Sequence, residues 1–129
     1  MKQSLLTKYN KYIEKINKIF FIVKHNYKLY DAYNNYQYLH QQHLKYLKII
    51  NKDKGLFEAQ VYSNSDDKIY DVTIDLEHDI YYCTCNSYVF LRYPIDNIND
   101  IFWRNSIAIC KHILFVLNRV SRYYMKMIQ

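Results

Sequence analysis

The residues best suited to chemistry are three Cys and one His, arranged in two short motifs. The first is Cys-Thr-Cys at positions 83–85, and the second is Cys-Lys-His at positions 110–112. Thiolate sulfur and imidazole nitrogen are ligands that Zn²⁺ prefers, and four of them complete a closed tetrahedral site. The sequence therefore predicts one structural zinc ion, with the metal ligands Cys83, Cys85, Cys110 and His112.

The spacing within each motif constrains the backbone around it. Side chains two residues apart on a straight strand lie about 7 Å apart, whereas two thiolates on one zinc ion lie about 3.8 Å apart. The chain must therefore bend at Thr84. Residues two apart in the middle of a helix point in nearly opposite directions. We therefore expect Cys110 at or before the first turn of a helix, whose N-terminus favours the thiolate form.

The segments next to the motifs have strand and helix patterns. Residues 56–62 and 70–76 alternate apolar and polar side chains, and residues 80–82 begin a third strand that leads into the first motif. The sequence after the second motif has one helical apolar stripe, made of Ile113, Val116, Leu117, Val120, Tyr124 and Met127. We therefore expect a small antiparallel sheet, then a zinc knuckle and then a C-terminal helix.

The N-terminal region, residues 1–54, reads as helical. Apolar residues recur every seven positions in two series, Leu6, Ile13, Phe20 and Tyr27, and Tyr9, Ile16, Val23 and Tyr30. A second helix is predicted from about Tyr36 to Ile50. The long helix could pack within the chain or pair with a second copy, and we favour packing within the chain. The predicted fold class is α+β, with this helical region before a zinc-binding ββα module over residues 55–129.

The order C-x-C, loop, C-x-H resembles the SWIM-type zinc finger. The resemblance includes a strand hairpin (LFEAQVY and KIYDVTIDL), CTC, a loop over residues 86–109, and CKHILFVL opening a helix. This loop is long for the family and holds Arg92, Pro94, Trp103 and Arg104. The resemblance implies zinc binding, and more loosely nucleic-acid or protein interaction. Some SWIM proteins of this length are partners of recombinase-like ATPases.

Composition excludes several other classes of protein. The chain has 129 residues with one Gly and one Pro, which rules out a collagen-like or Pro-rich disordered chain. No segment has the roughly 18 apolar residues of a membrane span, and the first residues have no apolar signal-peptide core. Three Cys do not suit a closed disulfide framework. We therefore expect an intracellular protein, without a membrane or small-molecule partner, whose thiols are available for metal.

Other candidate sites are weaker. His40 and His43 are spaced three apart, as on a helix surface, and His78 precedes the first motif. Asp71, Asp75 and Asp79 could form an acidic metal cluster, but Asp71 and Asp75 share one strand face with Thr73 between them, so we expect a solvated face instead. The sequence has no Gly-rich phosphate loop, no HExxH motif and no Ser-His-Asp signature. We therefore expect a protein that is not an enzyme.

Charge is segregated along the chain. Residues 1–52 have net charge +8, residues 53–100 have −7, and residues 101–129 have +5. A polyanion would be attracted to the two ends. The acidic middle could instead neutralise the ends within one fold. The candidate nucleic-acid contacts, with DNA as the ligand, are Lys8, Lys11, Lys15, Lys18, Lys111, Arg119, Arg122 and Lys126. The alternative is a protein-interaction adaptor or a helix-mediated homodimer.

Overall fold

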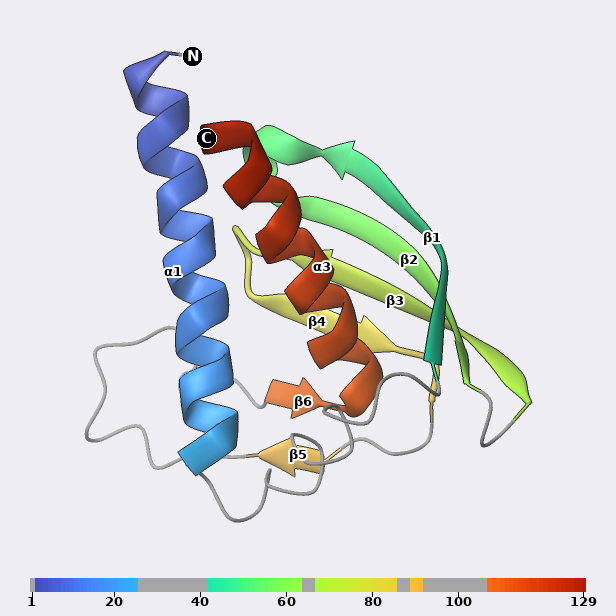
Figure 1. Cartoon of the computed structure of the whole chain (residues 1–129). Coiled ribbons are helices and arrows are strands. Elements are labelled where there is room, and N and C mark those ends of the chain that lie inside the picture. The colour runs from blue at the N-terminus through green and yellow to red at the C-terminus, as the bar shows by residue number, and fades with distance from the viewer. Residues whose placement is uncertain (1, 26–41, 64–66, 86–88, 92–106) are drawn as a thin grey trace.

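Two helices lie side by side over one face of a four-stranded antiparallel sheet (Figure 1). The computed structural model describes residues 2–25, 42–63, 67–85, 89–91 and 107–129. Its elements are, in order, α1 (Gln3–His25), β1 (Gln42–Asn51), the 3-10 turn η2 (Lys52–Lys54), β2 (Leu56–Ser63), β3 (Lys68–Asp75), β4 (Ile80–Cys83), β5 (Val89–Leu91), β6 (Ile107–Ile109) and α3 (Lys111–Ile128). The chain is therefore α+β in the predicted order of helix, sheet and helix.

The sheet has the simple order β1-β2-β3-β4. The alternation predicted for β2 and β3 is confirmed, because Phe57, Ala59 and Val61 are buried under the helices together with Val72 and Ile74. Their neighbours along each strand lie on the opposite face. The sheet thus has a helix-covered face and an outer face that no described element covers (Figure 1).

Helix α1 packs within the chain against α3, as we favoured. Its buried stripe consists of Tyr9, Tyr12, Ile16, Ile19 and Val23. The described members of one predicted apolar series, Tyr9, Ile16 and Val23, therefore lie in the buried stripe. The members of the other series that the structure describes, Leu6, Ile13 and Phe20, are only half-buried.

Buried tyrosines join the helices to η2. The rings of Tyr9 and Tyr12 lie 5.2 and 5.6 Å, centroid to centroid, from the ring of Tyr124. The Tyr124 hydroxyl donates to the carbonyl of Lys52 at 2.7 Å, and the Tyr12 hydroxyl donates to the carbonyl of Asp53 at 3.1 Å. Burial raises the pKa of Tyr9 and of Tyr12 to about 12. Three of the 16 tyrosines of the chain, Tyr9, Tyr12 and Tyr124, therefore belong to the core.

The predicted second helix is wrong over residues 42–50, where the structure has strand β1. The residues of β1 that pair with the buried Val61, Ala59 and Phe57 of β2 are Leu44, Leu47 and Ile49. Leu44 and Leu47 are half-buried, and Ile49 is 42% exposed. A β-bulge between Leu44 and Tyr46 inserts a residue, so the inward spacing is three and then two. Apolar residues three positions apart are typical of one face of a helix, which explains the wrong prediction. The rest of that prediction, residues 36–41, lies outside the described residues.

The single glycine caps η2 and directly precedes β2. Gly55 has φ of 65°, and its carbonyl accepts a hydrogen bond from the Leu76 amide at 2.9 Å. A Cβ added to Gly55 would lie 2.7 Å from the Leu76 Cβ. Both the backbone conformation and the close approach therefore require glycine here.

The segment between the two motifs has structure that the sequence analysis missed. Strands β5 and β6 pair antiparallel, with Val89 opposite Ile109. They lie inside the predicted loop, and β6 leads directly into Cys110. The pairing draws the two ends of the long connection together. The loop residues Arg92, Pro94, Trp103 and Arg104 lie outside the described residues. Among the described helices, none is long and apolar enough to cross a membrane.

Candidate metal centre

The four predicted ligands come together in the interior. The metal-binding atoms of Cys83, Cys85, Cys110 and His112 all lie within 4.8 Å of one another. Each of these residues is at most 3% exposed. The Nδ1 atom of His112 lies 3.8 Å from the sulfur of Cys83 and 3.8 Å from that of Cys110. The structure thus places four metal-binding groups around one point.

The first motif bends as its spacing requires. Strand β4 ends at Cys83, and the chain bends at Thr84 and Cys85. The bend is fastened to β3 by two hydrogen bonds. The Thr84 amide donates to the Asp71 carbonyl at 3.0 Å, and the Asp71 amide donates to the Thr84 hydroxyl at 2.9 Å. Thr84 itself is exposed while both cysteines are buried, so the bend points both sulfurs inward.

The second motif opens helix α3, as predicted. Cys110 is the N-cap residue in an extended conformation, with φ of −129° and ψ of 170°. The Leu114 amide donates to the Cys110 carbonyl at 3.1 Å, which begins the helical hydrogen bonding. His112 lies in the first turn. The helix N-terminus carries partial positive charge, which favours a thiolate at Cys110.

His112 is held by packing. Its ring lies 4.5 Å, centroid to centroid, from the ring of Tyr70, with 35° between the planes. Its Nε2 atom is buried and has no hydrogen-bond partner among the described residues. Because Nδ1 faces the sulfurs, it is the nitrogen that the geometry presents to a metal ion.

The electrostatics of the centre favour a cation. Hydrogen bonds with Cys83 and Cys85, together with burial, raise the pKa of the Cys110 thiol far above its ordinary value. At Cys83 the hydrogen bond with Cys110 lowers the pKa, but the hydrogen bond with Cys85 and burial outweigh it, and the pKa rises to about 12. Three neighbouring buried thiols cannot all ionise alone. A bound metal ion reverses this preference for the protonated thiol, because it stabilises each thiolate directly.

The donor set fits zinc in type and in spacing. A tetrahedral zinc site places two sulfurs about 3.8 Å apart and a sulfur and a nitrogen about 3.6 Å apart. The observed sulfur–nitrogen distances of 3.8 Å are close to this value. Four protein ligands would fill the coordination shell, which is the arrangement of structural sites. The residues therefore fit a closed site for one metal ion.

The other candidate ligands lie elsewhere. His78 is exposed in the turn between β3 and β4, where its Nδ1 atom lies 2.9 Å from a carboxylate oxygen of Asp75. Asp71 and Asp75 belong to the outer face of the sheet, as predicted, and Asp79 pairs with Lys15. His40 lies outside the described residues, and so does the side chain of His43.

All eight predicted nucleic-acid contacts lie on the two helices. Lys11, Lys18, Arg119, Arg122 and Lys126 are exposed on α1 and α3, whereas Lys8 and Lys111 are half-buried. The Arg119 guanidinium lies 5.3 Å from the centre of the Phe115 ring. The two helices lie side by side (Figure 1). We call the surface that α1 and α3 turn away from the sheet the helix layer.

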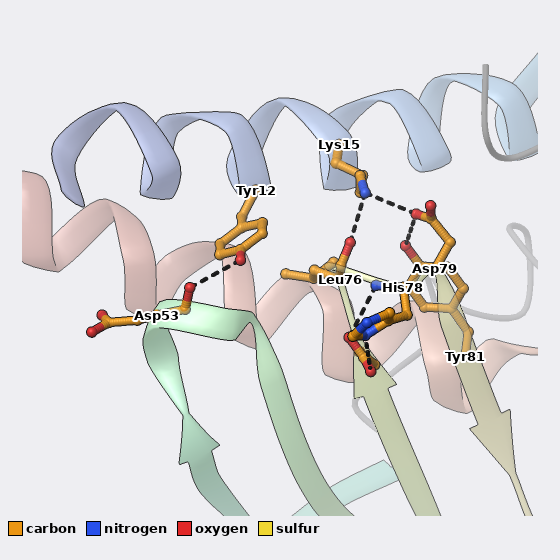
Figure 2. A network of polar contacts seen from close by, with 8 residues as sticks. Tyr12, Lys15, Asp53, Leu76, His78, Asp79 and Tyr81 are labelled. Carbon is orange, nitrogen blue, oxygen red and sulfur yellow. Dashed lines mark hydrogen bonds and ion pairs between the residues drawn. The ribbon is translucent and has the colours of Figure 1, made fainter. Parts of the chain in front are cut away.

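The prediction for Lys15 needs correction. Its ammonium group donates to the Leu76 carbonyl at 2.6 Å and pairs with Asp79 at 3.0 Å (Figure 2). The Asp79 side chain is only 3% exposed, so this pair holds α1 against the turn between β3 and β4. The Lys15 ammonium group therefore binds within the fold and does not face solvent as a phosphate contact would.

Two residues of the centre were missed by sequence reasoning. A backbone bend was predicted at Thr84, but the hydrogen bonds of its amide and hydroxyl with the Asp71 backbone were not. Tyr70 is the first apolar residue of the alternating segment 70–76, and that position was the available signal for its contact with His112. Both contacts depend on the register between distant segments.

No protein-family model, curated protein or solved structure matches this chain. The SWIM resemblance therefore rests on the two motifs and on the order of the elements. The chain has a buried Cys3His cluster that could bind a metal ion.

Proposed function

We propose that this chain is a SWIM-like zinc-binding protein in which one structural zinc ion joins β4 to α3, and that its helix layer binds nucleic acid, with DNA as the first candidate. The observation that carries the zinc proposal is the gathering of three buried thiols and the His112 Nδ1 atom within 4.8 Å. The two ligand motifs are distant in the sequence, because Cys110 follows Cys85 by 25 positions. A metal ion here would stabilise the fold by joining these two motifs.

The zinc proposal is tested by native mass spectrometry and by unfolding with a chelator. We expect one zinc ion per chain and a large loss of stability when the chelator removes it. Cys110→Ser should abolish stoichiometric binding. Ser121→Ala is a control, because Ser121 is a small buried residue of α3 that lies outside the cluster. Stoichiometric zinc in Cys110→Ser would refute the proposed ligand set.

The nucleic-acid proposal is supported by the charge of the helix layer. Helix α1 carries five Lys and one Glu, and α3 carries four Lys or Arg and no acid. The acids lie mainly in the sheet and its turns, which leaves the helix layer basic. Phosphate groups are attracted to such a surface, and the affinity falls steeply as salt increases.

Fluorescence anisotropy with labelled DNA tests this proposal. We expect Arg119→Glu with Arg122→Glu to weaken binding at low salt and to reduce the salt dependence. The matched control is Lys52→Glu with Lys54→Glu, which changes net charge equally at two exposed lysines of η2. An equal loss in both variants would indicate that net charge alone matters. Absence of binding at low salt would overturn the proposal while leaving the zinc proposal intact.

A further inference from the structure

The three thiols of the centre form a group that can bind a ligand without the histidine. Cys83 and Cys85 lie on either side of the bend that Thr84 fastens to β3, and Cys110 is fixed at the N-cap of α3. Their sulfur atoms lie within 4.8 Å of one another, and each residue is at most 3% exposed. The fold therefore holds three sulfurs together before any ligand arrives, and such preorganisation favours a ligand that needs three sulfurs.

The fourth group, His112, has weaker support. A histidine that binds a metal ion nearly always donates from its second ring nitrogen to a carboxylate, a carbonyl or a water, which raises the basicity of the ligand. The Nε2 atom of His112 is buried and has no hydrogen-bond partner among the residues that the structure describes. When Nδ1 binds a metal ion, the proton is on Nε2, and a buried donor without an acceptor costs free energy. His112 therefore lacks the contact that ordinarily strengthens a metal-bound imidazole.

Net charge also distinguishes two classes of ligand for this centre. Three thiolates and a neutral imidazole around Zn²⁺ leave one net negative charge, and burying a charge is costly. A trivalent atom bound to three sulfurs is neutral. It needs no fourth ligand, because its lone pair takes the fourth corner of the tetrahedron. In this centre that corner belongs to the Nδ1 atom of His112, which lies 3.8 Å from the sulfurs of Cys83 and Cys110.

We propose that Cys83, Cys85 and Cys110 together bind a trivalent thiophilic oxyacid of the arsenite class, and that His112 stays uncoordinated. In this step three As–O bonds and three S–H bonds break, three As–S bonds form, and three water molecules leave. Arsenic stays trivalent, so the step needs no oxidant or reductant. Thr84 is exposed between two of the cysteines, so the bend is the place where the centre lies closest to solvent.

Arsenite binding does not depend on the proposed function, because a chain without affinity for zinc would still hold the three thiols together. Displacement of zinc does depend on it. When arsenite displaces zinc, three protons are taken up, one Zn²⁺ is released and three water molecules form. Metal-free and zinc-loaded protein are therefore tested separately. A chain that binds arsenite but not zinc would refute the zinc proposal and support arsenite binding.

Intact mass spectrometry with arsenite as the probe measures the binding. Metal-free protein should gain one arsenic atom and lose three hydrogen atoms. X-ray absorption at the arsenic edge should find three sulfur neighbours and no nitrogen neighbour. Arsenite added to zinc-loaded protein should release the zinc to a chromophoric chelator, and zinc that stays bound at excess arsenite would overturn the displacement.

Paired variants separate the thiols from the histidine. Cys110→Ser should lose the adduct in which three hydrogen atoms are replaced. His112→Asn should keep the arsenite affinity of the parent chain and lose most of its zinc affinity. Ser121→Ala is the control, because Ser121 is buried in α3 outside the cluster, and this variant should bind both ligands like the parent chain. Circular dichroism verifies that each variant is folded.

The same titration in denaturant tests whether the fold matters. The unfolded chain has the same three thiols but must gather them from two distant motifs, so it should bind arsenite more weakly. Equal affinity in the folded and unfolded chain would overturn the proposal, because any three thiols would then serve. So would unchanged arsenite affinity in Cys110→Ser, a nitrogen neighbour of arsenic, or an equal loss of zinc and arsenite affinity in folded His112→Asn.

Discussion

Thr84 lies between two of the proposed ligands, and its replacement by valine should weaken metal binding. Its hydroxyl accepts the Asp71 amide at 2.9 Å, while its own amide donates to the Asp71 carbonyl at 3.0 Å. Valine removes the first bond and keeps the second. The bend is therefore loosened but still attached to β3, and the sulfurs of Cys83 and Cys85 are held less firmly in position.

The size of the effect follows from that single bond. A side-chain hydrogen bond contributes about 0.5–1.5 kcal/mol net. Thr84 is exposed, so water can reach the Asp71 amide in the variant, and no buried donor is left unsatisfied. If the whole contribution serves to organise the site, the zinc affinity of Thr84→Val falls between about twofold and about twelvefold.

Competition with a chromophoric chelator measures this affinity. Thr84→Ser keeps the hydroxyl and should bind zinc like the parent chain. Thr73→Val is the matched control, since Thr73 lies on the same outer face two residues along β3 from Asp71. Equal affinities for Thr84→Val, Thr73→Val and the parent chain would refute the positioning role of the hydroxyl.

Three further predictions concern stability. Gly55→Ala should lower the free energy of unfolding by about 1–2 kcal/mol for the left-handed backbone, with a further loss from overlap with the Leu76 Cβ at 2.7 Å; a denaturant midpoint like that of the parent would contradict this. Lys15→Met leaves the nearly buried Asp79 carboxylate without its cation and should cost about 2 kcal/mol, part of which Asp79→Asn in the same chain should restore; no loss in the single variant would contradict the interior role of Lys15. Metal-free protein should lose stability as pH rises from about 9 to about 12, because the pKa of Cys83 is raised from 9.0 when unfolded to about 12 when folded. Zinc-loaded protein should instead lose stability as pH falls, because protons compete for its ligands. Denaturant unfolding at a series of pH values measures both trends. The same change of unfolding free energy with pH in the metal-free and zinc-loaded forms would refute this prediction.

Local patterns were enough to predict the parts of the fold that position the centre. The alternation in β2 and β3 has a period of two, and the covered face followed directly from it. The spacing of the cysteines also constrains a few neighbouring residues, which is why the bend at Thr84 and the capping position of Cys110 were foreseen. These inferences needed no information about distant segments.

The errors arose where a distant segment or an irregularity decides the outcome. The bulge in β1 changes the inward spacing to three residues between Leu44 and Leu47, and this spacing favours a helical interpretation. Lys15 has helical spacing with the other lysines, but its partner Asp79 lies 64 residues later. Strands β5 and β6 are three residues each, too short for a periodic pattern.

X-ray absorption spectroscopy at the zinc edge of the purified protein tests whether three thiolates and one imidazole hold a single zinc ion. We expect three sulfur neighbours at about 2.3 Å and one nitrogen neighbour at about 2.0 Å. A shell made only of nitrogen and oxygen, or a shell with fewer than three sulfurs, would contradict it.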